Sequence, residues 1–264
     1  MRPLLMLLLL SLIIAVHESG HFVAMRLGGV TVEEFSIGLG PTLYERRGEV
    51  TVFRIRLLPF GGYVSPADKG PGSLGAASRP VRCIIFLAGM VMNALTAFLV
   101  LLLVPAAWKG QRSRGLRRLV SALVGSFGYW LSFPFLFLYL LVTRGTSLFR
   151  GLTGPIGIIM GRADGTGQTG ETGQKEDEEA PRKVAVPLPV WLAHNFALLS
   201  AAIAGFNLLP IYPLDGGQVV SALLEGFGPS VIALYEAAGL LIFASLVLIV
   251  FLIDFTWLSR RNRP

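Results

Sequence analysis

Long apolar runs alternate with polar segments along this chain of 264 residues, and five of the runs are long enough to cross a bilayer. A transmembrane helix needs about 20 predominantly apolar residues. The five runs cover residues 3–25, 81–107, 119–142, 188–209 and 231–257. This pattern predicts a polytopic α-helical membrane protein with about four core transmembrane helices, and 119–142 as one ambiguous hydrophobic or interfacial helix.

A different pattern lies between the first two runs, where apolar and polar residues alternate with a period of two. From Phe53 to Leu57 the apolar residues would lie on one face of a strand, with Arg54 and Arg56 on the other. Gly- and Pro-containing turns bound this stretch. We expect residues 31–64 to form a small membrane-associated β-hairpin or sheet.

The first run also has features of a secretory signal peptide, since Arg2 precedes a short apolar core. However, it offers no good cleavage site before Val16, and its removal would take away a cluster of polar residues. We therefore expect it to remain as the first span. Residues 161–187 are rich in Gly, Thr and Glu, which predicts a flexible aqueous loop. We expect 1–264 to form a single membrane domain.

Composition supports a membrane protein and narrows the partners. The chain is 53% hydrophobic and 15% charged, whereas soluble domains are about 25% charged. Its net charge of +7 comes mostly from basic residues beside the apolar runs, which predicts contact with the lipid bilayer rather than nucleic acid. The single cysteine, Cys83, excludes an internal disulfide and a cysteine-based metal cluster.

Ionisable residues interrupt the first apolar run, in the sequence HESGH at residues 17–21. Such residues are costly at membrane depth and are therefore usually functional. His17 and His21 are four apart, so on a helix they share a face and can bind one cation. Glu18 lies beside that face, where it can accept a proton from an attacking water. The alternative is a chance match or a hydrogen-bonded interior histidine pair, which the presence of only three histidines disfavours.

A catalytic zinc ion typically has three protein ligands, so a third must come from elsewhere. His194, the remaining histidine, is expected near the membrane interface. Asp215 is the best carboxylate, because the prolines and glycines around it break the helix and can turn its side chain into a cavity. The alternative is an ordinary loop whose aspartate caps the next helix. The other carboxylates in or near apolar runs are Glu225, Glu236 and Asp254.

Together these segments resemble the site-2 protease family of intramembrane zinc metalloproteases. HESGH matches its first motif, and residues 207–216, with Asn207, Pro210, Pro213, Asp215 and Gly216, match its second. Three further stretches resemble family features: FGGYV at 60–64 the β-loop, AGMVMNALTAF at 88–98 the second core helix, and LTGPIGI at 152–158 the segment before the aspartate helix. Met90 replaces a frequent proline, and no PDZ domain is visible after the second span.

The resemblance implies a zinc metalloendopeptidase that uses Zn²⁺ to hydrolyse peptide bonds within or near transmembrane segments. Its substrates would be single-span membrane proteins in regulated intramembrane proteolysis, or signal-peptide remnants. Its implied metal ligands are His17, His21 and Asp215, with Glu18 as the catalytic base. The candidate substrate-binding residues are Asn93, Asn207, Gly61 and Gly62. The two asparagines could stabilise the oxyanion or instead form interhelical hydrogen bonds.

A transmembrane substrate must unwind before cleavage, and an unwound segment could pair with a strand edge. Either an exposed edge within 50–58 or the glycines of FGGYV could supply that edge. Two rival functions remain open: a catalytically inactive scaffold for membrane partners, and a carrier of divalent metal ions. Oligomeric state is not predicted by the sequence.

Assembly of the motifs constrains the topology. For the two histidines to meet Asp215, the first helix and 188–209 must run in the same direction, which requires an odd number of crossings between them. Either 119–142 lies along or partly in the membrane, or the stretch LTGPIGIIM re-enters as an additional crossing. We favour four core crossings. Basic residues in the loop after the first crossing, and the family resemblance, favour a bacterial-type cell (inner) membrane with the site toward the cytoplasm.

Overall fold

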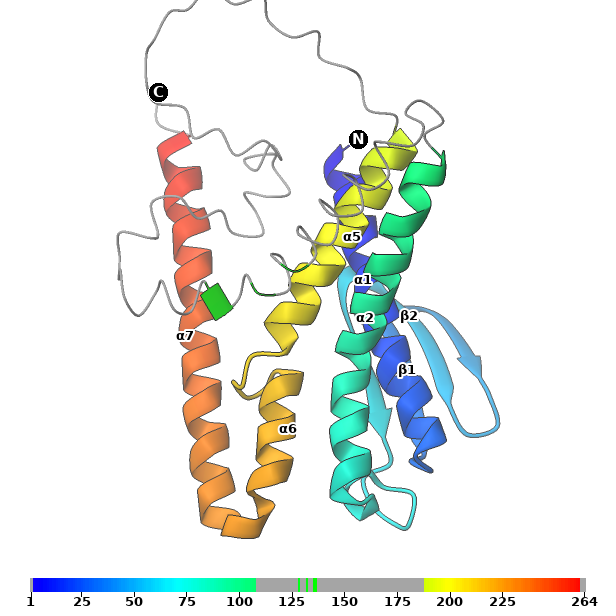
Figure 1. Ribbon diagram of the computed structural model, residues 1–264, viewed down its shortest axis with the longest axis vertical. Helices are drawn as coiled ribbons and strands as arrows, with labels where there is room; N and C mark the ends of the chain where they lie inside the picture. Colours follow the sequence, from blue (N-terminus) through cyan, green and yellow to red (C-terminus); the bar gives the residue numbers. More distant parts are fainter. Residues whose placement is uncertain (1, 108–127, 129–131, 133–134, 137–187, 262–264) are drawn as a thin grey trace, which may run out of the picture.

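The computed structural model describes residues 2–107, 128, 132, 135, 136 and 188–261. In these residues, long helices stand side by side and a small sheet lies beside the end of two of them (Figure 1). The predicted loop at 161–187, the stretch at 152–158 and all but four residues of the predicted helix at 119–142 lie outside the described residues.

Three of the described helices are long and apolar enough to cross a membrane. They are α1 (Arg2–Leu27), α2 (Arg79–Ala107) and α7 (Pro229–Arg261). Each contains an uninterrupted candidate span of more than 20 residues, which is enough to cross the hydrocarbon core. The chain is therefore a polytopic helical membrane protein with a small sheet, whereas four core spans stays a prediction.

A fourth long helix, α5 (Leu188–Asn207), packs against both α1 and α2. Phe196 of α5 joins Leu9 and Ile13 of α1 in one buried cluster. Against α2 the contact is made by small residues, with Ala97 packed on Ala197 and Ala201. Small side chains let membrane helices approach closely. In Figure 1, α1 and α5 run in one direction and α2 in the opposite one, as assembly of the two motifs requires.

The helix that begins in the apolar run at 188–209 is interrupted before Asp215, as the prolines and glycines there predict. The α5 helix ends at Asn207, and α6 (Asp215–Leu224) begins only after a loop that contains two prolines. A Cβ atom on Gly216 or Gly217 would collide with the backbone of this loop, so glycine is required for the first turn of α6 to pack on it. The α6 helix contacts α2 on one side and α7 on the other.

Beyond α6, the short helix η3 (Glu225–Phe227) leads into α7. Glu225 accepts hydrogen bonds from Arg79 and Arg82 at the start of α2. This ion-paired contact links the α6–α7 connection to the other helices. The span of α7 is only 6% buried among the described residues, and its main neighbours there are α6 and η3.

The predicted sheet consists of two antiparallel strands, β1 (Val32–Arg47) and β2 (Val52–Pro66). Both strands bend at glycines with positive φ, at Gly38, Gly40 and Gly61. As a result, residues 34–37 have partners in 62–65 as well as in 52–55, and 52–55 pair in addition with 44–47. The expectation of an exposed edge within 50–58 is therefore wrong for 52–55, whereas 62–66 pair on one side only within the described part of the chain.

The two faces of β2 differ as the alternation predicts. Phe53 packs with Phe35 and with Phe22 of α1, whereas Arg54 and Arg56 both bind Glu34 on the other face. Burial raises the pKa of the Glu34 carboxyl, but hydrogen bonds from Tyr63, Arg56 and Arg54 outweigh this effect and lower the pKa to about 2. This polar network, like the aromatic cluster, ties the first half of β1 to β2.

Two buried clusters position the site. A buried cluster of Met25, Val30, Val32 and Ile85 joins the end of α1 to β1 and α2. A separate cluster of Leu209, Ile211 and Leu214 fixes the loop before α6. A 3-10 turn, η1 (Leu74–Ala76), closes the connection from the sheet to α2.

Candidate metal centre

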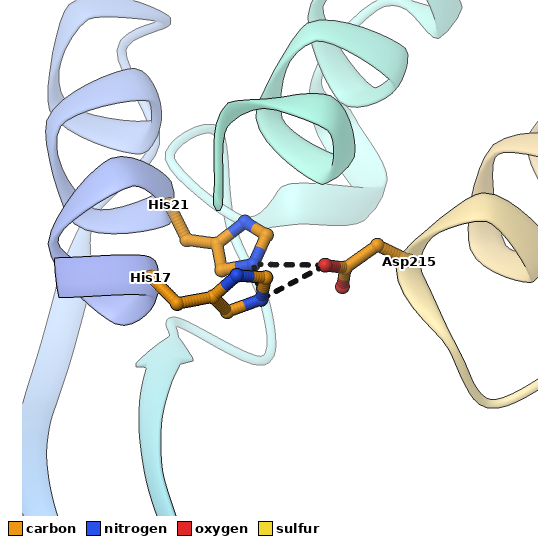
Figure 2. Close-up of side chains that lie close together, drawn as sticks. All are labelled: His17, His21 and Asp215. Carbon is orange, nitrogen blue, oxygen red and sulfur yellow. Dashed lines mark hydrogen bonds and ion pairs between the residues drawn. The ribbon is translucent and has the colours of Figure 1, made fainter. Parts of the chain in front are cut away.

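His17, His21 and Asp215 converge from α1 and α6 (Figure 2). The Nε2 atoms of the two histidines lie 3.0 and 3.4 Å from Oδ2 of Asp215, and 3.2 Å from each other. Among the described residues, these three form the one group of three or more His, Cys, Asp or Glu side chains close enough together to hold a metal ion. We call it the ligand triad.

The spacing of the triad fits a tetrahedral ion. Ligand atoms about 2.0–2.1 Å from a tetrahedral zinc ion lie about 3.3 Å apart, close to the three observed distances of 3.0, 3.2 and 3.4 Å. Two imidazoles and one carboxylate are also a ligand set that zinc uses in catalytic sites. All three residues are buried, at 7–8% exposure. The arrangement therefore offers three converging ligands in a shielded position.

The local structure explains why these side chains meet. His17 and His21 lie one helical turn apart on α1, so their rings project from the same face. Asp215 is the first residue of α6, and Leu214 occupies the N-cap position without a side-chain hydrogen bond. The alternative in which Asp215 caps the helix is therefore not what the structure shows, because its carboxylate faces the histidines.

Helix α2 covers the other side of both imidazoles. Nδ1 of His21 lies 2.8 Å from the carbonyl oxygen of Ile85, and Nδ1 of His17 lies 3.3 Å from Nδ2 of Asn93. Between these two positions, a Cβ atom on Gly89 would lie 2.8 Å from Nε2 of His17 and would also collide with His21. Gly89 is therefore required for this close approach of α2 to the triad.

Glu18 lies beside the triad rather than within it. It follows His17 directly on α1 and is not one of the three converging side chains. On its other side, the Glu18 carboxylate meets the backbone of Val64, and its Cγ would lie 3.3 Å from a Cβ atom on Gly62. The sheet thus approaches the site through the single-paired segment 62–66. Gly61 supplies the preceding bend, with a φ of +91°.

The remaining candidates lie in different surroundings. Asn207 donates a hydrogen bond to the Ile203 carbonyl of its own helix, and among the described residues no hydrogen bond joins it to the triad. His194 is exposed on α5. Glu225 pairs with arginines of α2, and Glu236 accepts a hydrogen bond from Ser221. The side chain of Asp254 lies outside the described part.

The residues that sequence reasoning missed all lie in α2 or in the sheet. Ile85 acts through its backbone carbonyl, Gly89 through the absence of a side chain, and Val64 through its backbone. None of these features has a chemical signature in the sequence. The spacing of four residues from Ile85 to Gly89 and from Gly89 to Asn93 was the signal that could have placed them on one helical face.

Comparison with known sequences agrees with this geometry. The sequence profile described as peptidase family M50 matches residues 5–252. The chain belongs to this family, the site-2 proteases. The predicted family membership is therefore confirmed, and with the apolar helices it makes the chain an integral membrane protein.

Several curated proteins are similar to this M50 chain over part of their length. A Synechocystis protein named "Putative zinc metalloprotease" is 40% identical over 102 residues, which is 35% of this chain and 28% of the relative. A Fusobacterium nucleatum protein with the same name is 38% identical over 129 residues, or 47% of this chain and 38% of the relative. An Arabidopsis thaliana protein, "Probable membrane metalloprotease ARASP2, chloroplastic", is 36% identical over 101 residues, or 35% and 23% of the two chains. The matches thus span less than two fifths of each of these relatives.

Proposed function

We propose that this M50 protein is an intramembrane zinc metalloprotease, in which His17, His21 and Asp215 hold Zn²⁺. The observation that carries the proposal is the convergence of the two motifs, far apart in sequence, into one buried triad with the spacing of zinc ligands. The names of the curated relatives agree with this cofactor. Its substrates would be single-span membrane proteins or signal-peptide remnants.

Each residue of the site then has a distinct task. Bound zinc would supply a Lewis acid that lowers the pKa of water and polarises the scissile carbonyl. Glu18 accepts the proton from the attacking water and transfers it to the nitrogen of the leaving amine. Its place outside the triad suits this role, because a ligand carboxylate would not be free to exchange protons. Burial of the triad keeps bulk water away from the reacting groups.

We propose that the unwound substrate adds as a strand along residues 62–66. Among the described residues this segment has strand partners on one side only, and it lies against Glu18. In a strand, N–H groups two residues apart point to the same side. The backbone of Val64 faces Glu18, so the N–H of Gly62 faces the same open edge. Gly61 and Gly62 are therefore the proposed substrate contacts, while substrate binding by Asn207 stays a prediction.

The finer features of membrane placement are part of the same proposal. We place the site toward the cytoplasmic side of a bacterial-type cell (inner) membrane, with four core crossings in a single protease domain. The support is the basic loop that follows α1 and the common direction of α1 and α5 (Figure 1).

The test separates metal binding from catalysis. The protein, purified in detergent and reconstituted in vesicles with a quenched fluorescent single-span peptide, is assayed for bound zinc and for cleavage. Glu18→Gln is expected to retain zinc and lose cleavage, because it keeps the triad and removes only the proton acceptor. His17→Ala is expected to lose both. His194→Ala is the matched control and is expected to lose neither, because that histidine is exposed on α5.

Two results would contradict the proposal. Cleavage that persists in Glu18→Gln would remove the assigned base. Zinc that is bound by the wild type but transported into the vesicles without any peptide cleavage would favour the metal carrier instead.

A further inference from the structure

Helix α2 presents three consecutive positions of one face to the two imidazoles of α1. Ile85, Gly89 and Asn93 are spaced four residues apart, as are His17 and His21 on the facing helix. The Ile85 carbonyl meets Nδ1 of His21, and the Asn93 carboxamide meets Nδ1 of His17. Both Nδ1 atoms thus have a partner on α2, and both Nε2 atoms face Asp215.

The two Nδ1 partners are chemically different. A backbone carbonyl only accepts hydrogen bonds, so Ile85 requires His21 to carry its proton on Nδ1 and leaves Nε2 free to bind a metal. A carboxamide can either donate or accept. In the structure, Nδ2 of Asn93 faces Nδ1 of His17. This arrangement suits the opposite tautomer, with the proton of His17 on Nε2 and directed at Asp215, 3.0 Å away.

Asn93 also has an oxygen that lacks a partner. The residue is fully buried, at 0% exposure, and no donor among the described residues reaches its Oδ1. A buried acceptor without a donor lowers the stability of the folded state. Rotation of the carboxamide by half a turn would exchange Nδ2 and Oδ1. It would bring the unpaired oxygen to Nδ1 of His17, where it could accept a proton that has moved there.

We propose that Asn93 is a positioning residue that selects the zinc-binding tautomer of His17, by accepting a hydrogen bond from its Nδ1–H through Oδ1. The inference rests on the proposed zinc function and deepens it. It assigns to one side chain of α2 the task of keeping Nε2 of His17 free to bind zinc. His21 is fixed by a carbonyl in one tautomer. His17 is switchable, and the carboxamide follows its proton.

A purely structural role would be an interhelical hydrogen bond in which Asn93 only donates, joining α2 to α1. Replacing Asn93 by aspartate distinguishes the proposed acceptor role from this structural donor role. Asp accepts but does not donate when ionised, and it has nearly the same shape as Asn. It therefore preserves the proposed interaction with Nδ1–H and abolishes the structural one.

The experiment measures the zinc dissociation constant of the full chain in detergent by competition with a chelator, for Asn93→Asp and Asn93→Leu. Outer-shell partners of metal-bound histidines typically contribute about 10- to 100-fold in affinity. We expect Asn93→Leu to weaken zinc binding by about this factor and Asn93→Asp to bind within a few-fold of the wild type. The absorption spectrum with Co²⁺ in place of zinc should remain that of a tetrahedral site in Asn93→Asp and change in Asn93→Leu.

Asn195→Leu is the matched control, because it removes a carboxamide from α5 whose Nδ2 donates, among the described residues, to the Trp191 carbonyl of its own helix. It should leave both measurements unchanged. Circular dichroism of the metal-free proteins checks folding, and if Asn93→Leu does not fold, Asn93→Ala replaces it with the same expectation.

The outcomes distinguish this inference from the proposed function. Zinc binding of wild-type strength in Asn93→Leu, or an equal loss in Asn93→Asp and Asn93→Leu, would overturn the role of Asn93 and leave the zinc protease intact. Absence of zinc binding in the folded wild type would overturn both.

Discussion

The histidine side and the aspartate side of the triad are supported in different ways. His17 and His21 lie on one long helix, and α2 holds both rings from behind through Ile85 and Asn93. Asp215 starts a short helix after a loop, on a part of the chain joined to α2 by the packing of α6 and the ion pairs of Glu225. Beyond it, α7 is largely exposed.

The two sides of the triad therefore contribute differently to metal binding: the histidines are oriented in advance, and Asp215 completes the ligand set. The two imidazoles lie on one helix and are held by contacts to α2, so they form a preorganised pair, whereas the carboxylate completes the triad from a separate element. Ligands held by their own hydrogen bonds bind metals better than ligands that must be ordered first. We therefore expect changes on the histidine side to affect metal affinity more than equivalent changes on the aspartate side.

The largest effects should come from loss of a ligand. His21→Ala and Asp215→Ala should each weaken zinc binding beyond the loss of about 10- to 100-fold typical of an outer-shell partner. His21→Ala should bind zinc more weakly than Asp215→Ala, because Asp215→Ala still leaves two positioned imidazoles. Isothermal titration of zinc into each purified variant measures the difference. The reverse order would contradict the comparison.

The next largest effect should come from Gly89→Ala. The new Cβ would lie 2.8 Å from Nε2 of His17, so either the ring or α2 must move. We expect zinc affinity to fall by about 10- to 100-fold, as for other losses of ligand orientation. Gly226→Ala is a suitable control on the aspartate side, because its nearest contact would be an ordinary 3.8 Å. Equal affinities in the two variants would show that α2 does not set the histidine geometry.

Changes in the sheet should affect cleavage without affecting zinc. Gly62→Pro removes the N–H that faces the open edge, whereas Gly62→Ala adds the same Cβ beside Ser36 and Glu18 but keeps that N–H. We expect the proline variant to cleave about 2- to 10-fold more slowly than the alanine variant, since one strand hydrogen bond is lost. Zinc content should be equal in both. Equal cleavage rates would exclude strand addition at this edge.

The smallest effect should come from Glu225→Gln, which weakens the contact between α2 and the connection after α6. Partly exposed ion pairs contribute about 0–1 kcal/mol, so zinc affinity should fall by up to about fivefold and the difference should shrink at high salt. Glu45→Gln, in a comparable ion pair on the sheet, should leave affinity unchanged. A salt-independent loss would point to a role for Glu225 other than this ion pair.

Sequence reasoning reached furthest where chemistry and spacing coincide. The two motifs predicted the triad, because ionisable residues inside a membrane are usually functional. The histidines have the spacing of one helical turn, and the aspartate lies where the helix is broken. The alternation in β2 likewise predicted its apolar and polar faces. The predicted edge within 50–58 was wrong for 52–55 because glycine bends fold each strand back on the other, and such non-local pairing leaves no trace in a local pattern.

The parts that could not be predicted depend on contacts between distant elements. The Ile85 carbonyl acts through the backbone, which carries no side-chain signal. The sequence left Asn93 open between an oxyanion contact and an interhelical hydrogen bond, and it gave no sign that the carboxamide approaches Nδ1 of His17. That approach depends on how α1 packs against α2, which the sequence of either helix alone does not specify.

The central claim is that His17, His21 and Asp215 bind one zinc ion together. X-ray absorption at the zinc edge of the purified protein tests it most directly, with zinc content measured on the same sample. We predict one zinc per chain, two imidazole ligands and only nitrogen and oxygen neighbours at about 2.0–2.1 Å. A zinc–sulfur distance of about 2.3 Å, which would implicate Cys83, or a spectrum without imidazole scattering would contradict the claim.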